Sequence, residues 1–496
     1  MSILKKLAGQ SAIYGLSSIV GRFLNYLLVP LHTNIFTQPG QYGVVTELYA
    51  YISFLMIIYT YGMETSFFHF SEKDKNNQKK VFGTGMITLF FSTILFSGSV
   101  ILFSGSIAEV LDYEKHPEYI TWMALILGFD ALTALPFARL RQQSRARRFA
   151  FLKLLNIFIN IFFNILFFII LPVWYRNDEA MMHSFAQLVY NPDTGVGYVF
   201  IANLLASVVT LLLMIPEMKF SRSDYDRTLL WKMILYSLPL LLAGLAGMVN
   251  ETIDRIMVKY LIDGPANAMK QLGIYGACYK LSILMTLFIQ AFRYAAEPFF
   301  FAQFKQEDAK KVYAMVMKYF VITCSIIFLG IMMYIDIVKY FIGKNYWPGL
   351  KVVPVLLLAN LCLGVFFNLS MWYKLTGKTM FGAGFAVFGA VITIVFNLIL
   401  IPRYGYMGAA WTTLVCYGSM MTLSYLTGQH YYKIAYDVRR MGGYLLFAIA
   451  LYFLSKFMVH VTEPGMMLKL FINSIILFIY LFILSKLERP PVTLNS

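Results

Sequence analysis

Long apolar runs alternate along the chain with short connections that are rich in lysine and arginine. A helix of about 20 apolar residues crosses the ~30 Å hydrocarbon core of a bilayer. The pattern therefore predicts an all-α polytopic membrane protein with about fourteen transmembrane helices. The expected spans lie near 9–33, 41–63, 81–105, 119–138, 150–172, 197–216, 230–262, 271–297, 312–335, 350–373, 380–401, 406–428, 441–460 and 467–485.

The basic residues indicate how the chain is oriented. Lysine and arginine accumulate in the short cytoplasmic loops of membrane proteins. With the N-terminus in the cytoplasm, the cytoplasmic connections hold about three times as many of them as the external ones, the largest cluster lying at 139–153. We therefore expect both termini in the cytoplasm and the long connection 172–197 outside.

An internal repeat relates the two halves of the chain. Arg255 follows Arg22 by 233 positions. The same interval relates Glu47 to Lys280, Glu64 to Glu297, Arg141 to Lys374, and Tyr42-Gly43 to Tyr275-Gly276. Spans one to six thus recur as spans seven to twelve. Because each half has an even number of spans, both halves have the same orientation in the membrane and are related by a pseudo-two-fold axis along the membrane normal. We expect an N-lobe at 1–220, a C-lobe at 221–432, a central cavity between them, and two further helices at 433–496.

Composition supports a membrane protein. Of 496 residues, 59% are hydrophobic and 13% are charged, whereas soluble domains carry about 25% charged residues. The net charge of +16 would suggest nucleic acid in a soluble protein. Here it reflects the basic loops, so no nucleic-acid partner is expected. The four cysteines lack a CxxC spacing and the six histidines are dispersed, so we expect no metal site, no cofactor and no hydrolytic motif.

Four cations lie within or beside apolar runs: Arg22, Arg255, Lys280 and Arg293. A charged side chain at the bilayer centre costs roughly 2.5–3.5 kcal/mol, so such residues face protein or a watery cavity. Arg22 and Arg255 occupy equivalent positions of the repeat and are expected to face the central cavity. A cationic cavity suits an anionic ligand, and a guanidinium binds two phosphate oxygens at once.

Structural ion pairs are the alternative explanation for these arginines. Glu251 precedes Arg255 by four residues, the favourable helical spacing for a pair. Glu47 could reach Arg22 from the neighbouring span. Asp254 is adjacent to Arg255 in sequence and therefore points elsewhere on the helix.

Three further acids are candidates for gating or ion coupling. Glu64 and Glu297 lie near the cytoplasmic ends of their spans, where they either gate the cavity or are solvated. Asp130 has no evident partner and is a candidate proton or cation site. A stripe of asparagines on the fifth span favours hydrogen bonds between helices; it comprises Asn156, Asn160 and Asn164.

Several stretches carry a family resemblance: GRFLNYLLVPLHTNIFTQPGQYGVV, NETIDRIMVKYLID with GIYGACYKLS, FNLILIPRYGYMGAAWTT, and the basic loop RLRQQSRARR. The chain resembles the polysaccharide and lipid-linked oligosaccharide flippases of the multidrug/oligosaccharidyl-lipid/polysaccharide exporter superfamily over nearly its whole length. The resemblance implies transfer of an undecaprenyl-pyrophosphate-linked glycan, a surface polysaccharide or lipopolysaccharide precursor. Transfer would run from the cytoplasmic to the periplasmic leaflet of a bacterial inner membrane by alternating access.

The resemblance also implies partners and alternatives. The partners are the pyrophosphate of the lipid-linked glycan, membrane lipid, and H⁺ or Na⁺ as candidate coupling ions, with the protein acting as a monomer. Relatives that flip the peptidoglycan precursor carry arginines in span one and its neighbours, but here span two carries Glu47 instead. Multidrug or cation efflux is the alternative within the superfamily. A membrane glycan polymerase or ligase is a third class. Such enzymes need a sizeable external loop for their chemistry, and the largest one here, 172–197, offers Arg176, Asp178, Glu179, His183 and Asp193.

Overall fold

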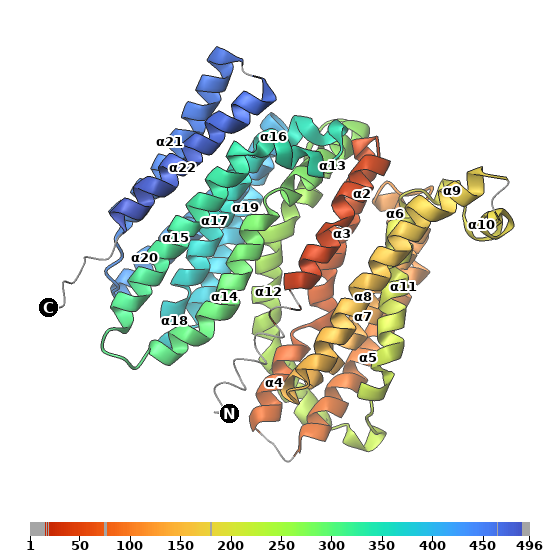
Figure 1. Cartoon of the computed structure of the whole chain (residues 1–496). Coiled ribbons are helices and arrows are strands. Elements are labelled where there is room, and N and C mark those ends of the chain that lie inside the picture. The colour runs from red at the N-terminus through yellow and green to blue at the C-terminus, as the bar shows by residue number, and fades with distance from the viewer. Residues whose placement is uncertain are drawn as a thin grey trace. The chain divides into compact units, whose positions relative to one another are not determined.

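The computed structural model describes residues 15, 17, 19–73, 77–178, 181–463 and 465–488, and they fold into helices joined by short connections (Figure 1). No strand occurs within these ranges. The all-α fold class expected from the apolar pattern is confirmed.

Most of the expected spans are present as helices. In the described part of the chain, eleven helical stretches are long and apolar enough to cross a membrane, and a twelfth span results if the bent pair Pro265–Lys280 and Ile283–Gln303 is counted as one. The helix Tyr406–Tyr431 coincides with the expected span 406–428 but is not among the apolar stretches. The first expected span begins outside the described residues. A multi-pass membrane fold is confirmed, while the count of fourteen and the side of each terminus stay predictions.

The chain forms two compact units. Unit 1 comprises Met1–Gly276 with Thr393–Tyr406, and unit 2 comprises Ala277–Ile392 with Met407–Ser496. Two helices, Pro265–Lys280 and Met380–Tyr404, run from one unit into the other. The expected division into an N-lobe at 1–220, a C-lobe at 221–432 and two further helices at 433–496 is based on the sequence repeat, whereas the two units are defined by their compactness. The expected division therefore stays a prediction.

Unit 1 is a helical bundle. Its helices are α2 (Leu28–Ile35), α3 (Pro39–Thr60), α4 (Met63–Lys73), α5 (Gln78–Leu102), α6 (Ser104–Val110), α7 (Glu118–Gln142), α8 (Ala146–Ile165), α9 (Leu171–Arg176), α10 (His183–Val189), α11 (Gly197–Met214) and α12 (Arg227–Leu261). Shorter turns are η2 (Leu166–Ile170), η3 (Pro192–Thr194), η4 (Ile215–Glu217) and η5 (Arg222–Asp224). α7 packs against α5 and α11, α8 packs against α11, and α12 lies along α3 and α4. Apolar side chains of α4, α5, α7 and α12 meet in a core that includes Phe67, Leu89, Leu135 and Met233.

Glycines bring two backbones of unit 1 into contact. A Cβ on Gly43 of α3 would lie 2.4 Å from the carbonyl oxygen of Met269, in α13 (Pro265–Lys280). A Cβ on Gly273 would lie 1.8 Å from the carbonyl oxygen of Pro39. Only glycine permits such an approach, so the start of α3 is held directly against α13.

Unit 2 is built around α15. Its helices are α14 (Ile283–Gln303), α15 (Ala309–Met333), α16 (Ile335–Val338), α17 (Val353–Leu369), α18 (Met371–Leu375), the part of α19 (Met380–Tyr404) up to Ile392, α20 (Tyr406–Tyr431), α21 (Val438–Thr462) and α22 (Met466–Leu487), with 3₁₀ turns η6 (Lys339–Phe341) and η7 (Lys344–Val352). α15 packs against α14, α17, α21 and α22 (Figure 1). Two hydrogen bonds join α22 to α15, one between the Ser325 and Tyr480 hydroxyls (2.6 Å) and one from Asn473 Nδ2 to the Met333 carbonyl (2.6 Å). The C-terminal pair α21–α22 is thereby docked on unit 2.

Candidate functional site

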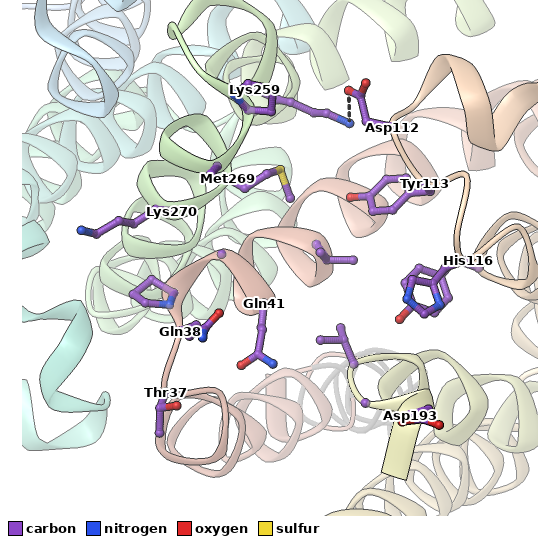
Figure 2. Close-up of a pocket in the computed structure, with 18 residues that line it drawn as sticks. Thr37, Gln38, Gln41, Asp112, Tyr113, His116, Asp193, Lys259, Met269 and Lys270 are labelled. Carbon is purple, nitrogen blue, oxygen red and sulfur yellow. Dashed lines mark ion pairs between the residues drawn. The ribbon is translucent and has the colours of Figure 1, made fainter. Parts of the chain in front are cut away.

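A buried ion pair joins α3 and α12 in unit 1. Glu47 of α3 has no exposed surface. Lys259, near the end of α12, donates from Nζ to Glu47 Oε1 at 3.0 Å, and its side chain is 5% exposed. The hydroxyl of Tyr113 donates to Glu47 Oε2 at 2.6 Å. Lys259 also donates to the Leu111 carbonyl, and its ammonium lies 3.4 Å from Asp112 Oδ2. Figure 2 marks the Lys259–Asp112 ion pair.

The network satisfies both buried charges. A buried ion is tolerated only when its partner and hydrogen bonds offset the loss of hydration. Tyr113 lies in the connection after α6, and burial together with the Glu47 carboxylate raises its pKa well above the ordinary value. Its hydroxyl therefore stays protonated and serves as the donor to Glu47.

This arrangement corrects the expectation that Glu47 reaches Arg22. The carboxylate is occupied by Lys259 and Tyr113. The sequence does not single out Lys259, because it lies three residues from the end of the expected span 230–262, where lysines usually extend toward water. The signal in the sequence was Glu47 itself, an acid within an apolar run that required a cation from another helix.

A pocket of about 810 Å³ opens beside this network, within unit 1. Figure 2 shows the side chains around it. The lining comes from the start of α3 and the residues before it, the connection between α6 and α7, the turn before α11, and the stretch from the end of α12 into α13. It comprises Thr37, Gln38, Pro39, Gly40, Gln41, Val44, Asp112, Tyr113, His116, Tyr119, Asp193, Gly195, Val196, Lys259, Pro265, Ala266, Met269 and Lys270.

Of the four expected cavity cations, Arg22 and Arg255 belong to unit 1. Arg22 is exposed on the helical stretch that precedes α2. Arg255 is half-buried on α12 and donates from Nη1 to the main-chain carbonyl of Glu251 at 3.0 Å. Glu251 itself is exposed. Asp254 is buried, and its carboxylate accepts from the Tyr275 hydroxyl at 2.6 Å and from the Arg255 amide at 2.9 Å.

Lys280 and Arg293 belong to unit 2. Lys280 is the exposed last residue of α13. The guanidinium of Arg293, on α14, lies 4.6 Å from the centre of the Phe367 ring, a favourable cation–π contact. Because these four cations are divided between the two units, their convergence on one cavity stays a prediction.

An acid–base pair recurs at equivalent places of the repeat. Glu64 of α4 pairs with Arg141 at the end of α7. In unit 2, Glu297 of α14 pairs with Lys374 of α18 at 2.6 Å. The interval of 233 relates Glu64 to Glu297 and Arg141 to Lys374. Each pair therefore joins the second and fourth spans of its half, counted in the repeat.

Asp130, which had no evident partner in the sequence, accepts a hydrogen bond from Ser207 of α11 at 2.8 Å. The asparagine stripe of α8 forms the interhelical hydrogen bonds that its spacing predicted. Asn156 donates to Thr210 (2.8 Å), Asn160 donates to Asn25 (3.3 Å), and the side-chain oxygen Asn164 Oδ1 lies 2.7 Å from His32 Nε2.

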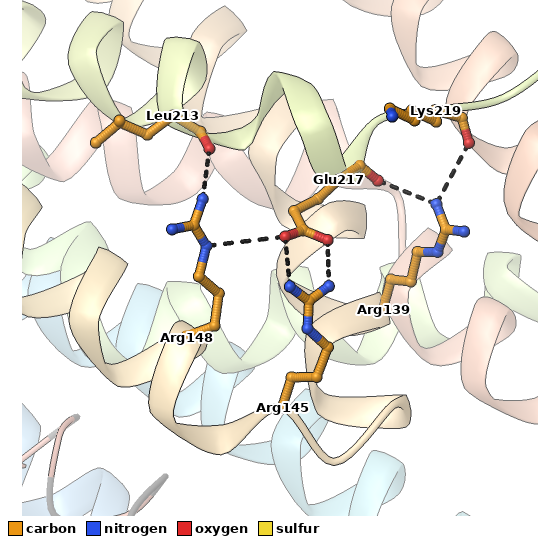
Figure 3. A network of polar contacts seen from close by, with 6 residues as sticks. All are labelled: Arg139, Arg145, Arg148, Leu213, Glu217 and Lys219. Carbon is orange, nitrogen blue, oxygen red and sulfur yellow. Dashed lines mark hydrogen bonds and ion pairs between the residues drawn. The ribbon is translucent and has the colours of Figure 1, made fainter.

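The arginines at the junction of α7 and α8 form hydrogen bonds and ion pairs with the residues that follow α11 (Figure 3). Arg145 binds the Glu217 carboxylate through both terminal nitrogens, at 2.5 and 2.9 Å, and Arg148 Nε lies 3.8 Å from it. Arg139 donates to the carbonyls of Glu217 and Lys219 at 3.1 and 3.3 Å. These contacts fasten the connection after α11 to the ends of α7 and α8.

Comparison with known proteins gives one family match and several similar folds. Residues 36–176 match the family described as "Polysaccharide biosynthesis protein". No curated protein matches the chain. Lipid II flippase MurJ in an inward closed conformation has a TM-score of 0.70 at 12% identity, covering 96% of this chain and 99% of that one.

Multidrug transporters share the fold as well. An inward-facing multidrug resistance MATE family transporter of the MOP superfamily has a TM-score of 0.65 at 15% identity, covering 85% of this chain and 94% of that one. A MATE complex with MaD3S has a TM-score of 0.60 at 14% identity, covering 85% and 95%. At these identities the likeness establishes the fold alone. It agrees with the superfamily resemblance seen in the sequence, and the match over 36–176 agrees with its polysaccharide branch.

Proposed function

We propose that the protein flips a lipid-linked glycan across a bacterial inner membrane by alternating access of two lobes. The observation that carries the proposal is the match of residues 36–176 to a polysaccharide biosynthesis family within a fold like that of MurJ. MurJ is a lipid II flippase, and a fold that flips a lipid supports transfer of a lipid-linked substrate here. Transport, rather than catalysis, is the activity that this fold supports.

The proposed ligand for the intramembrane cations is the pyrophosphate that links lipid to glycan. Arg22 and Arg255 occupy equivalent positions of the two halves, and Arg255 has its guanidinium on the predicted cavity-facing helix α12. Guanidinium groups bind phosphate oxygens in pairs. Lys280 and Arg293 would assist from unit 2, and H⁺ or Na⁺ remains the candidate coupling ion.

A sidedness assay tests this function. The purified protein is reconstituted into vesicles with lipid-linked glycan extracted from cells that make it, and the glycan exposed outside is measured with a membrane-impermeant oxidant. We expect exposure of the inner-leaflet fraction to be much faster than in protein-free vesicles. Equal rates with and without the protein would contradict the proposal.

Drug efflux is the second candidate, because MATE transporters share the fold over 85% of this chain. The same vesicles separate the two functions when they are loaded with a fluorescent organic cation such as ethidium. Efflux of ethidium under a proton or sodium gradient, without glycan transfer, would favour the drug transporter.

A further inference from the structure

The pocket beside the Glu47–Lys259 pair has the size of a ligand site. Its volume of about 810 Å³ falls in the usual range of roughly 300–1,000 Å³ for small-molecule sites. That is room for more than one sugar ring. We propose that this pocket binds the glycan portion of the transported lipid, a further subsite that rests on the proposed flippase function.

The lining offers the two kinds of contact that a sugar requires. Gln38 and Gln41 are exposed at the start of α3, and each amide provides donors and an acceptor for hydroxyl groups. Tyr119 and His116 stack at 4.8 Å between ring centroids with an interplanar angle of 5°. Tyr119 is buried, and His116 is half-buried with its Nδ1 2.9 Å from Glu118 Oε1, so the His116 ring is the amphipathic surface that this pair offers to a ligand. A sugar ring, with apolar C–H faces and polar edges, matches this combination.

The charges of the pocket favour a neutral ligand over a phosphate. Asp112 and Asp193 supply two carboxylates and Lys259 and Lys270 supply two ammonium groups. Lys259 is already engaged by Glu47 and Asp112. The lining therefore lacks the excess positive charge on which a pyrophosphate would depend. A metal is not favoured either, since the described residues contain no group of three or more His, Cys, Asp or Glu arranged to hold one.

The walls of the pocket are held in place by contacts that need no ligand. Tyr113 is fixed by its hydrogen bond to Glu47. Pro39 and Met269 face the pocket from backbones held together at Gly43 and Gly273. A preformed site of this kind binds without first ordering its own side chains.

The predicted topology gives the pocket a role in transport. Apart from Val44 and Lys259, which lie within expected spans, its lining comes from connections 33–41, 105–119, 172–197 and 262–271. The charge distribution places all four connections outside. A glycan that has crossed the membrane would meet this surface while its pyrophosphate remains nearer the bilayer. The pocket is thus a product-side glycan site, separate from the cations proposed to hold the pyrophosphate.

Binding of lipid-free glycan tests the site directly. The probe is the oligosaccharide released by mild acid from the lipid-linked pool of cells that make the protein, observed by saturation-transfer NMR with the full chain in nanodiscs. Gln41→Ala removes an exposed hydrogen-bonding side chain and should weaken binding about five- to tenfold. Gln187→Ala, an exposed glutamine of α10 outside the pocket, is the matched control and should leave binding unchanged.

The outcomes separate this inference from the proposed function. Absence of saturation transfer, equal weakening by the two variants, or displacement of the glycan by inorganic pyrophosphate would each overturn the glycan site. If the glycan site were overturned but the reconstituted protein still flipped the lipid-linked glycan, the proposed function would stand. Binding that depends on Gln41 without any flipping would instead uphold the site and refute the function.

Discussion

Glu47 and Lys259 illustrate how strongly a buried charge depends on its partner. The acid has no exposed surface, and the lysine reaches it from a helix more than two hundred residues away in sequence. Removing one member of such a pair leaves the other ion buried and uncompensated, which costs about 3–5 kcal/mol. Replacing both by apolar residues avoids that cost.

We therefore expect Lys259→Met to lower the melting temperature of the detergent-purified protein markedly, and Glu47→Leu combined with Lys259→Met to recover most of the loss. Lys270→Met, at an exposed lysine of the same pocket, serves as the control and should change little. A double variant as unstable as the sum of the two single losses would show that the residues do not act as a pair.

Asp336, in α16, gives a pH-dependent contact. Burial raises its pKa, but hydrogen bonds and charge from Lys339 and Lys469 outweigh burial and hold the pKa below its ordinary value. A lowered acid pKa contributes stability that is present above the unfolded pKa, about 4, and is lost as pH falls through the lower folded value. Lys469 lies in the first turn of α22, so this contact helps to dock that helix.

Hydrogen exchange in the first turns of α22 should accordingly be insensitive to Asp336 titration near neutrality. After correction for intrinsic rates, protection should fall only as the pH drops below about 4. Asp336→Asn should reduce protection at pH 7 and remove that acid-dependent part. Unchanged protection in Asp336→Asn at pH 7 would mean that the ion pair does not hold α22.

At the scale of helices, the apolar runs of the sequence predict where the helices lie. Apolar runs predicted α5, α7, α11 and α15 within a few residues, because each helix must match the bilayer thickness. The break between α13 and α14 was not predicted. The run 271–297 was expected to be one span, yet the chain bends by 49° after Lys280, and neither proline nor glycine occurs at 281–282 to signal it.

The partners of charged residues were harder to predict than the helices. Spacing suggests an ion pair for Arg255 with Glu251 and a contact of Glu47 with Arg22, because it relates a residue only to neighbours along one helix or on the next span. Tertiary packing instead brings Lys259 to Glu47 and Ser207 to Asp130. The repeat identified Glu64 with Glu297 and Arg141 with Lys374, but it did not indicate that the acid and base of each half would meet.

The pair Glu297–Lys374 allows a charge-swap test. Its side chains are 36% and 26% exposed, so screening by water limits the pair to about 1 kcal/mol or less. Glu297→Lys or Lys374→Glu alone should lower the melting temperature slightly by placing like charges together, and the double swap should restore it. Failure of the double swap to recover either single loss would show that the contact contributes nothing through charge.

At the scale of the whole molecule, the distribution of lysine and arginine predicts the topology. Reporter tags at either terminus or within 139–153 should be cytoplasmic, because these segments belong to the basic side. A tag within 176–194 should be external. A cytoplasmic signal from 176–194 would overturn the arrangement of every span from the fifth onward and would place the glycan pocket on the wrong side.

Flipping by an arginine variant tests the central claim most directly. In the vesicle sidedness assay, Arg255→Ala should abolish transfer of the lipid-linked glycan while the protein remains folded, with an unchanged melting temperature. Arg255→Lys should rescue only part of the rate, since an ammonium cannot bind two phosphate oxygens as a guanidinium does. Glu251→Gln is the control for a structural pair and should flip normally. If Arg255→Ala, Arg255→Lys and Glu251→Gln all lowered the melting temperature equally, Arg255 would be a structural ion-pair member and the pyrophosphate would bind elsewhere.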